Sequence, residues 1–266
     1  MSLRHIRGWL IDLDGVMYRG ETVVEGAAGF VAALRAERTP FLFLTNNSSR
    51  TQEQYARRLQ SMGIPAEPEE FYTSALATAE YLARRAPAGS RVLMIGMDGL
   101  REALEKAGFV LVQDPAEAQY CVVGYDIHLT YKDLVRATTT IRAGAPFIGT
   151  NPDPTLPTEG GFVPGNGAIL AALATATGVK PTIIGKPERI ILDLALERLG
   201  LQAGECAILG DRLDTDIVGG KKAGLFTILI LTGSTTAEEA LKANERPDLI
   251  VKDFSELMKL WQARFA

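Results

Sequence analysis

The stretch Gly8-Trp9-Leu10-Ile11-Asp12-Leu13-Asp14-Gly15 places two acids and a glycine directly behind a short apolar run. An apolar run of this length is typical of a buried β-strand, and the acids mark its carboxyl end. Further runs of this kind stand at 41–44, 71–73, 182–184, 207–209, 226–231 and 249–251. Segments with helical spacing separate them, such as Ala27, Phe30, Val31 and Leu34. Apolar strands that alternate with helices predict a parallel sheet covered on both faces, which is an α/β doubly wound core.

The middle of the chain, 80–179, also has an α/β pattern. Strands are expected near 91–95, 120–123 and 146–148, helices near 99–107 and 131–141, and a Gly/Pro-rich segment covers 151–167. The expected strand ends in this region lack the polar residues that follow the other strands. We therefore predict an inserted α/β domain at 80–179, with the core formed by 1–79 and 180–266.

Composition excludes several classes of function. The 266 residues carry a formal net charge of -4, so the chain lacks the basic excess of proteins that bind nucleic acid polymers or anionic membranes.

No apolar stretch approaches the ~18 residues that span a bilayer, and we expect a cytoplasmic protein. Cys121 and Cys206 lie in apolar runs and are expected to be reduced core thiols. Two histidines, His5 and His128, are too few for a His-based metal site.

Polar residues follow several of the predicted strands at the point where each strand ends. They are Asp12 and Asp14, then Thr45, Asn46 and Asn47, then Lys186, and finally Asp211 with Asp214 and Asp216 behind it. Ligands of open α/β sheets bind beyond the carboxyl ends of the strands. If these strands are neighbours, their polar residues meet at one edge of the sheet.

The acids in this set suit phosphoryl transfer. A phosphomonoester dianion repels an anionic nucleophile, so an attacking carboxylate needs a cation that contacts both, and Mg²⁺ prefers such oxygen ligands. Asp12 can then attack phosphorus and form an aspartyl-phosphate. Asp14, two residues on, can protonate the leaving oxygen and later deprotonate water. Asp211 would complete the metal site, with Asp216 holding Asp211 or a metal-bound water.

The remaining residues suit phosphate binding. Thr45 offers a hydroxyl, and the amides of Asn46 and Asn47 point outward if they lead into a helix N-terminus. Lys186 supplies a compact positive charge directly before a helix that begins near Pro187. Together, these residue types predict an Mg²⁺-dependent phosphatase that acts on small phosphomonoesters.

Four ordered motifs of this chain resemble those of the haloacid dehalogenase (HAD) superfamily. They are Asp12-Leu13-Asp14-Gly15-Val16, Leu44-Thr45-Asn46-Asn47, Gly185-Lys186-Pro187 and Gly210-Asp211-Arg212-Leu213-Asp214-Thr215-Asp216-Ile217. The residues of these motifs are similar to those of subclass IIA, the p-nitrophenyl phosphatase and nucleotide monophosphatase group. Further similarities are Thr150-Asn151-Pro152-Asp153, Pro164-Gly165-Asn166-Gly167 and Leu231-Thr232-Gly233, so the resemblance covers nearly the whole chain.

The resemblance implies a Rossmann-like HAD core with an inserted α/β cap domain that sets substrate choice. It implies that Asp12 is the nucleophile and Asp14 the acid/base, while Thr45, Asn46, Asn47 and Lys186 bind phosphate. Mg²⁺ is then expected on Asp12, the main-chain carbonyl of Asp14, and Asp211. The implied partner is a small phosphorylated metabolite, and a homodimer through the cap is a further implication.

Each motif alone has a simpler interpretation. The stretch 45–49 could be only a helix N-cap, Lys186 a surface lysine, and Asp211 and Asp216 capping or surface acids. Their occurrence in one order, behind successive apolar runs, favours a shared site. Asp214 is interpreted as a surface or capping acid. In the cap, pocket-lining and structural roles both stay open for Tyr125, Asp126, His128, Asn151, Asp153 and Asn166.

Two other kinds of binding loop do not fit the sequence, and two other functions remain alternatives to the phosphatase. A calcium loop fails because its fifth position would be Val16, which has no ligand oxygen. Gly165-Asn166-Gly167 lacks the preceding strand and the third glycine of a dinucleotide-binding loop. Another HAD-type phosphoryl or phosphonyl transfer remains an alternative, as does a receiver-like signalling module that is phosphorylated on aspartate. A receiver module carries no carboxylate two residues after the phosphorylated aspartate, whereas Asp14 stands at that position here.

Overall fold

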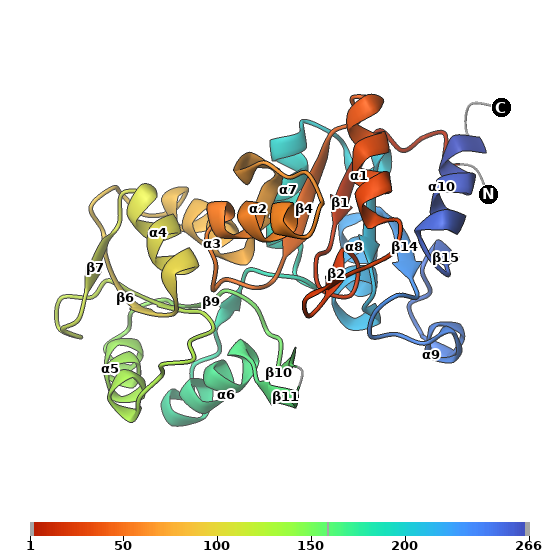
Figure 1. The fold of residues 1–266 in the computed structure, drawn as a ribbon. Helices are drawn as coiled ribbons and strands as arrows, with labels where there is room; N and C mark the ends of the chain where they lie inside the picture. The colour runs from red at the N-terminus through yellow and green to blue at the C-terminus, as the bar shows by residue number, and fades with distance from the viewer. Residues whose placement is uncertain (1–2, 159, 264–266) are drawn as a thin grey trace. The chain divides into compact units, whose positions relative to one another are not determined.

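A computed structural model describes residues 3–158 and 160–263 of the chain (Figure 1). Its contacts divide the chain into two units. The first unit contains the chain up to Thr45, then Glu53–Tyr72, and the chain from Lys186 onward. The second unit contains Asn46–Gln52 and Thr73–Gly185.

The first unit is built on a six-stranded sheet with the strand order β15-β14-β13-β1-β4-β5. The strands are β1 (Gly8–Ile11), β4 (Phe41–Thr45), β5 (Phe71–Thr73), β13 (Cys206–Gly210), β14 (Phe226–Ile230) and β15 (Leu249–Val251). At its centre β1 pairs in parallel with β13 and with β4, and Trp9 lies opposite both Ala207 and Phe41. The chain segments that leave β1 and β13 therefore start side by side, and the parallel core predicted from sequence is confirmed.

Helices cover both faces of this sheet (Figure 1). They are α1 (Ala27–Ala36), α2 (Gln52–Ser61), α7 (Arg189–Leu199), α8 (Val218–Ala223), α9 (Ala237–Lys242) and α10 (Phe254–Gln262), with short 3-10 turns at Pro68–Glu70 and Ala203–Glu205 and a π-helical turn at Leu213–Ile217. A small hairpin follows β1 and consists of β2 (Tyr18–Arg19) and β3 (Thr22–Val23). Helices α1, α2 and α10 belong to one buried apolar cluster, whereas Gly220 of α8 packs on Ile208 from the opposite face.

An aromatic cluster fixes α1 and α10 on the sheet. The Trp9 ring of β1 meets Phe30 of α1 edge-on at 5.0 Å and Trp261 of α10 at 5.9 Å between centroids. All three side chains are fully buried. Burial of large aromatic surfaces is the main stabilising contribution here, and it anchors the strand that carries Asp12.

The second unit contains a parallel five-stranded sheet with the order β12-β9-β8-β6-β7. Its strands are β6 (Arg91–Ile95), β7 (Val110–Val112), β8 (Tyr120–Val123), β9 (Phe147–Gly149) and β12 (Thr182–Ile183), with a separate hairpin of β10 (Thr155–Thr158) and β11 (Gly161–Pro164). Its helices are α3 (Ser74–Ala83), α4 (Asp98–Lys106), α5 (Tyr131–Arg142) and α6 (Asn166–Thr177). A second α/β domain was expected in this part of the chain, and the strands and helices predicted near β6, β8, β9, α4 and α5 are confirmed.

One strand belongs to a different sheet from the one we expected. The run 182–184 was interpreted as a core strand that delivers Lys186 to the edge of the core sheet. In the structure Thr182 pairs with Ile148 and Ile183 with Gly149, so β12 is an edge strand of the second sheet. That interpretation was wrong because an apolar run predicts a strand but does not identify its partner. The second unit runs to Gly185, and the cap boundaries near 79 and 180 stay a prediction.

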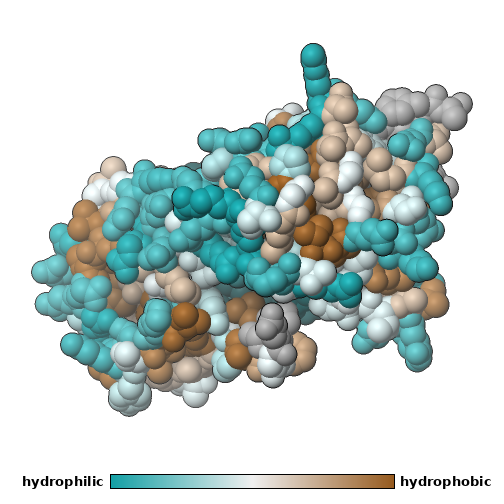
Figure 2. Space-filling model, in the orientation of Figure 1, coloured by the Kyte–Doolittle hydropathy of each residue, from teal (hydrophilic) through white to brown (hydrophobic). Residues whose placement is uncertain are grey.

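The face seen in Figure 2 is mostly hydrophilic, with separate hydrophobic patches. Exposed apolar side chains include Ile127, Tyr131 and Phe162, all in the second unit. Among the described residues, none of the helices combines the length and the apolar character that a bilayer crossing requires.

Both cysteines are buried free thiols, as the sequence predicted. Cys121 lies on β8 of the second sheet and Cys206 begins β13 of the first. Burial raises the pKa of each thiol to about 12, and the charge of Glu205 adds to the shift at Cys206. Neither thiol is ionised at neutral pH in the folded protein.

Asp248, which lies just before β15, is hydrogen-bonded to the start of β14, and these bonds are expected to stabilise the fold. Its carboxylate accepts hydrogen bonds from the main-chain N–H and the hydroxyl of Thr227, both at 2.8 Å, and from Lys221. Partial burial raises the pKa of Asp248, but the bonds from Lys221 and Thr227 outweigh it and lower the pKa below 3.8. Asp248→Asn should therefore cost about 1–2 kcal/mol at neutral pH and lower the apparent Tm by a few degrees.

The pH dependence of the Tm difference between the wild type and Asp248→Asn tests whether the difference is electrostatic. The pKa of the Asp248 carboxyl is lower in the folded state than in the unfolded state. The carboxyl therefore stabilises the fold at pH values above its unfolded-state pKa, and this stabilisation is lost as the pH falls through its folded-state pKa. Thermal unfolding followed by circular dichroism should show the wild-type advantage at pH 7 and a smaller one below about pH 4. Glu238→Gln, at an exposed pair with Lys242, serves as the control with unchanged Tm. A pH-independent difference would contradict the electrostatic explanation.

Candidate active site

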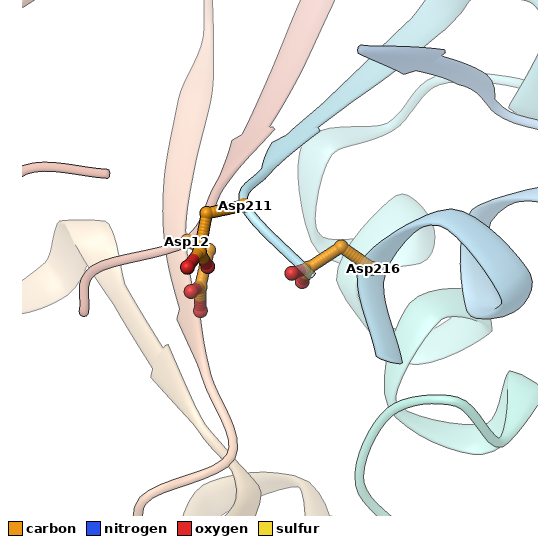
Figure 3. Close-up of side chains that lie close together, drawn as sticks. All are labelled: Asp12, Asp211 and Asp216. Carbon is orange, nitrogen blue, oxygen red and sulfur yellow. The ribbon is translucent and has the colours of Figure 1, made fainter. Parts of the chain in front are cut away.

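Three carboxylates meet at the carboxyl edge of the first sheet. Asp12 directly follows β1 and Asp211 directly follows β13, and the main-chain N–H of Asp12 donates to the carbonyl of Leu209 at 2.9 Å. Asp216 reaches them from the π-helical turn behind β13. One oxygen from each carboxylate lies within 4.8 Å of the other two. Figure 3 shows the three side chains gathered behind their strands, with Asp216 pointing toward Asp12 and Asp211. The parallel pairing of β1 with β13 thus brings together acids that are about two hundred residues apart in sequence.

Lys186 lies between two of these acids. Its Nζ donates to Asp12 Oδ1 and to Asp216 Oδ1, both at 2.7 Å, and to the carbonyl of Leu44 at 3.3 Å. The side chain is only 2% exposed. One ammonium therefore connects the ends of β1 and β4 with the π-helical turn. The sequence predicted that Lys186 joins Asp12 and Asp211, but it did not predict that Asp216 holds Lys186.

Burial and charge shift the pKa values of this cluster. Burial raises the pKa of Asp12 well above its ordinary value; Lys186 lowers it, while Asp216 and Asp211 raise it. Burial also raises the pKa of Asp211 to about 6, and the charge of Asp216 adds to this shift. Lys186 shows the opposite balance: burial lowers its pKa, but Asp12 and Asp216 together raise it above the ordinary value. The acids outnumber the cation, so the cluster favours a further positive charge.

The donor set fits a hard divalent cation. Asp211 Oδ2 accepts the main-chain N–H of Ser234 at 2.6 Å. Asp211 Oδ1 is buried and has no hydrogen-bond partner among the described residues. A buried carboxylate oxygen without a partner is costly unless a cation contacts it. Carboxylate oxygens at this spacing suit Mg²⁺, which takes one or two protein carboxylates and completes its shell with other oxygens.

Asp14 lies on the turn behind Asp12 and is exposed. Gly15 follows it with φ of 83°, a backbone conformation that favours glycine. Asp14 raises the pKa of the buried Tyr18, after the larger effect of burial itself, so its charge lies close to that phenol. The structure thus places Asp14 near Asp12 in the chain but in contact with solvent, as an acid that exchanges protons requires.

The predicted phosphate-binding stretch is divided between the units. Thr45 is the last residue of β4 and is 3% exposed, whereas Asn46 and Asn47 belong to the second unit. Asn46 Nδ2 donates to Asp153 Oδ2 at 2.8 Å, and Asn47 Oδ1 accepts from the N–H of Ser49 at 2.9 Å. Helix α2 begins only at Gln52, so the expected entry of Asn46 and Asn47 into a helix N-terminus is not found. Their phosphate-binding role stays a prediction.

The other acids and amides singled out in the sequence have structural partners. Asp214 is exposed and pairs with the guanidinium of Arg212 at 2.8 Å, as expected of a surface acid. In the second unit, Asn151 Nδ2 donates to Asp153 Oδ2 at 2.7 Å, and Asn166 Nδ2 donates to the carbonyl of Asn151 at 2.9 Å. All three members of this network are buried, which favours the structural role over a pocket lining.

Comparisons with known proteins agree with the motifs. A family model described as haloacid dehalogenase-like hydrolase matches residues 9–110, and a HAD-hydrolase-like model matches residues 183–257. The acid sugar phosphatase of Staphylococcus aureus is 46% identical over 254 residues, which cover 96% of this chain and 97% of that protein.

Solved structures give the same result. The 4-nitrophenylphosphatase of Thermotoga maritima superimposes with a TM-score of 0.92 at 36% identity and covers 98% of this chain and 99% of its own. The glycerol phosphate phosphatase of Mycobacterium tuberculosis, solved in complex with magnesium, has a TM-score of 0.89 at 38% identity, over 97% of this chain and 78% of its own.

Proposed function

The chain belongs to the haloacid dehalogenase-like hydrolase family, and on that basis we propose that it is an Mg²⁺-dependent phosphatase that forms an aspartyl-phosphate on Asp12. The observation that carries the proposal is the buried cluster of three carboxylates around the ammonium of Lys186. A cluster of this kind provides a nucleophile, oxygen ligands for a cation and a fixed positive charge at one strand edge.

The metal would be held by Asp12, Asp211 and the main-chain carbonyl of Asp14. The buried Oδ1 of Asp211, which has no hydrogen-bond partner among the described residues, supports this assignment. The choice of Mg²⁺ is supported by the mycobacterial relative, which was solved in complex with magnesium. When bound, Mg²⁺ would neutralise the charge repulsion between the phosphate and the carboxylates. Asp216 would keep Lys186 in place, since it accepts a hydrogen bond from Nζ at 2.7 Å.

In the proposed reaction, a carboxylate oxygen of Asp12 attacks phosphorus and the bond to the leaving oxygen breaks. Asp14 gives its proton to that leaving oxygen, so the product departs as an alcohol. Water then attacks the aspartyl-phosphate while Asp14 takes up its proton, which releases inorganic phosphate and regenerates the Asp12 carboxylate. Lys186 offsets the negative charge that accumulates beside Asp12 in both steps.

Thr45, the last residue of β4, and the following Asn46 and Asn47 are proposed to bind the phosphate oxygens, because they match the family motif that has this role. The substrate class is a small phosphorylated metabolite. The relatives bear the names acid sugar phosphatase, 4-nitrophenylphosphatase and glycerol phosphate phosphatase, which makes sugar phosphates and glycerol phosphate the first compounds to test. The homodimer through the cap and the cytoplasmic location stay predictions from the sequence.

Phosphate release from p-nitrophenyl phosphate tests the proposal. We expect many turnovers per protein molecule with Mg²⁺, a fall of at least about a hundredfold in EDTA, and recovery when Mg²⁺ is added back. Thermal unfolding in EDTA, as a control, should show that the chain stays folded while it is inactive. Full activity in EDTA would contradict the metal assignment, and one persistent phosphorylation per molecule would favour the receiver-like alternative. A phosphomonoester panel ranked by kcat/KM then identifies the substrate.

A further inference from the structure

The loop behind β14 contacts two parts of the candidate site at once. Thr232 Oγ1 donates to the main-chain carbonyl of Gly15 at 2.8 Å. Two residues later, the N–H of Ser234 donates to Asp211 Oδ2 at 2.6 Å. A single short segment is therefore bonded both to the turn that carries Asp14 and to the carboxylate of Asp211.

The bond from Thr232 completes the fixation of Gly15. The N–H of Gly15 donates to the carbonyl of Tyr18 at 2.8 Å, so both peptide groups that flank Gly15 are held. A peptide unit is planar, and its C=O points away from its N–H. Holding the N–H of Gly15 therefore also fixes the direction of the Asp14 carbonyl. With both flanking peptides held, the turn has little freedom to rotate that carbonyl.

Glycines allow the loop and the turn to approach Asp211 closely. A Cβ added to Gly233 would lie 2.0 Å from Asp211 Oδ2, and one added to Gly15 would lie 2.3 Å from the same atom. Either distance is far below van der Waals contact. The carboxylate of Asp211 is thus enclosed by two glycines from different segments, and its Oδ2 is held by Ser234.

We propose that Thr232 is a positioning residue for the metal site: its hydroxyl locks the Asp14-Gly15 turn against Asp211, so that the Asp14 carbonyl and the Asp211 carboxylate keep the spacing that a cation requires. The inference rests on the proposed function of the same site. The bond of Thr232 goes to the main chain of Gly15, and among the described residues it makes none to the side chain of Asp14 or Asp211. Partners that orient metal ligands in this way are worth about ten- to a hundredfold in metal affinity or activity.

Thr232→Val tests the role, because it removes the hydroxyl and keeps the branched shape. Isothermal titration of the purified full chain with MgCl₂ should give a Kd about ten- to a hundredfold higher than that of the wild type. Thr232→Ala is measured beside it, since it removes the same hydroxyl without placing a methyl group against the Gly15 carbonyl. Thr232→Ser, which keeps the hydroxyl, should restore the Kd to within about threefold of wild type.

Thr227→Val is the matched control. Thr227 lies on β14 itself, is fully buried, and donates its hydroxyl to Asp248 Oδ2 at 2.8 Å, away from the cluster. Its replacement should lower the apparent Tm but leave the Kd for Mg²⁺ at the wild-type value. A general loss of stability therefore cannot produce the pattern expected of Thr232.

The outcomes separate this inference from the proposed function. A wild-type protein that binds Mg²⁺, combined with folded Thr232→Val and Thr232→Ala variants of unchanged Kd, would overturn the positioning role alone. An equal loss of affinity in Thr227→Val would overturn it as well. A wild-type protein that neither binds Mg²⁺ nor releases phosphate would contradict the proposed function, and the positioning role would fail with it.

Discussion

Asp12→Asn should lower kcat for phosphomonoester hydrolysis by at least about a thousandfold, because an amide cannot form the acyl-phosphate bond. The fold should survive. Asp12 lies at the end of β1, outside the apolar core, and an asparagine Oδ1 can still accept the bond that Lys186 now makes at 2.7 Å. Phosphate release and thermal unfolding measured on the same preparation check both parts of this prediction.

Asp214→Asn is the control for Asp12→Asn. It makes the same chemical change in the same edge region, but at an exposed acid that pairs with Arg212. Its kcat and Tm should match those of the wild type. Wild-type turnover by a folded Asp12→Asn protein would show that the nucleophile lies elsewhere.

Lys186→Met should have the largest combined effect on activity and stability. The methionine keeps the apolar stem but leaves Asp12, Asp216 and Asp211 facing one another without the ammonium. Removing one partner of a buried ion pair costs about 3–5 kcal/mol, which corresponds to a fall in apparent Tm of roughly 10 °C in EDTA. We expect kcat/KM to fall at least about a hundredfold, since the charge beside the attacked phosphorus is lost.

Added Mg²⁺ distinguishes this explanation from a simple packing defect. A divalent cation among the three acids should relieve part of their repulsion, so the Tm deficit of Lys186→Met should be smaller in Mg²⁺ than in EDTA. Lys222→Met removes a lysine whose Nζ lies 3.7 Å from Glu188 at the surface, and it should change neither Tm nor activity. A Tm deficit independent of Mg²⁺ would contradict the electrostatic account.

Much of the fold could be predicted from sequence because it depends on local pattern. The runs that became β1, β4, β13 and β14 are mainly apolar, which is typical of buried parallel strands. The membership of β12 could not be predicted in the same way. Its two residues pair with β9, more than thirty positions earlier, and no local signal distinguishes that partner from a core strand.

Helix α6 and the hairpin that precedes it were missed for a related reason. The segment 151–167 is rich in glycine and proline, and no strand or helix was predicted there. In the structure two of those glycines allow close backbone approach: a Cβ on Gly165 or on Gly167 would lie 2.4 or 2.2 Å from a main-chain carbonyl oxygen of the segment before the hairpin. Composition alone does not separate a loop from tightly packed backbone.

In the site, too, residue types and their order could be predicted from the sequence, whereas contacts between distant segments could not. Residue types and their order placed Asp12, Asp211, Asp216 and Lys186 together, and their geometry in the structure agrees with this. The bond from Thr232 to Gly15 joins residues 217 positions apart through a hydroxyl and a backbone carbonyl. Any residue type can supply that carbonyl, so the sequence contains no pattern from which the contact could be inferred.

The two buried thiols make it possible to measure local opening of each sheet in the native chain. Cys121 and Cys206 each lie within a different sheet, and their raised pKa values keep them unreactive while that sheet is closed. Alkylation by a small thiol reagent therefore requires the surrounding strands to separate, and the labelling rate of each cysteine measures how often they do. Mass spectrometry of the two tryptic peptides would then give separate opening rates for the catalytic sheet and for the inserted one, without introducing any mutation.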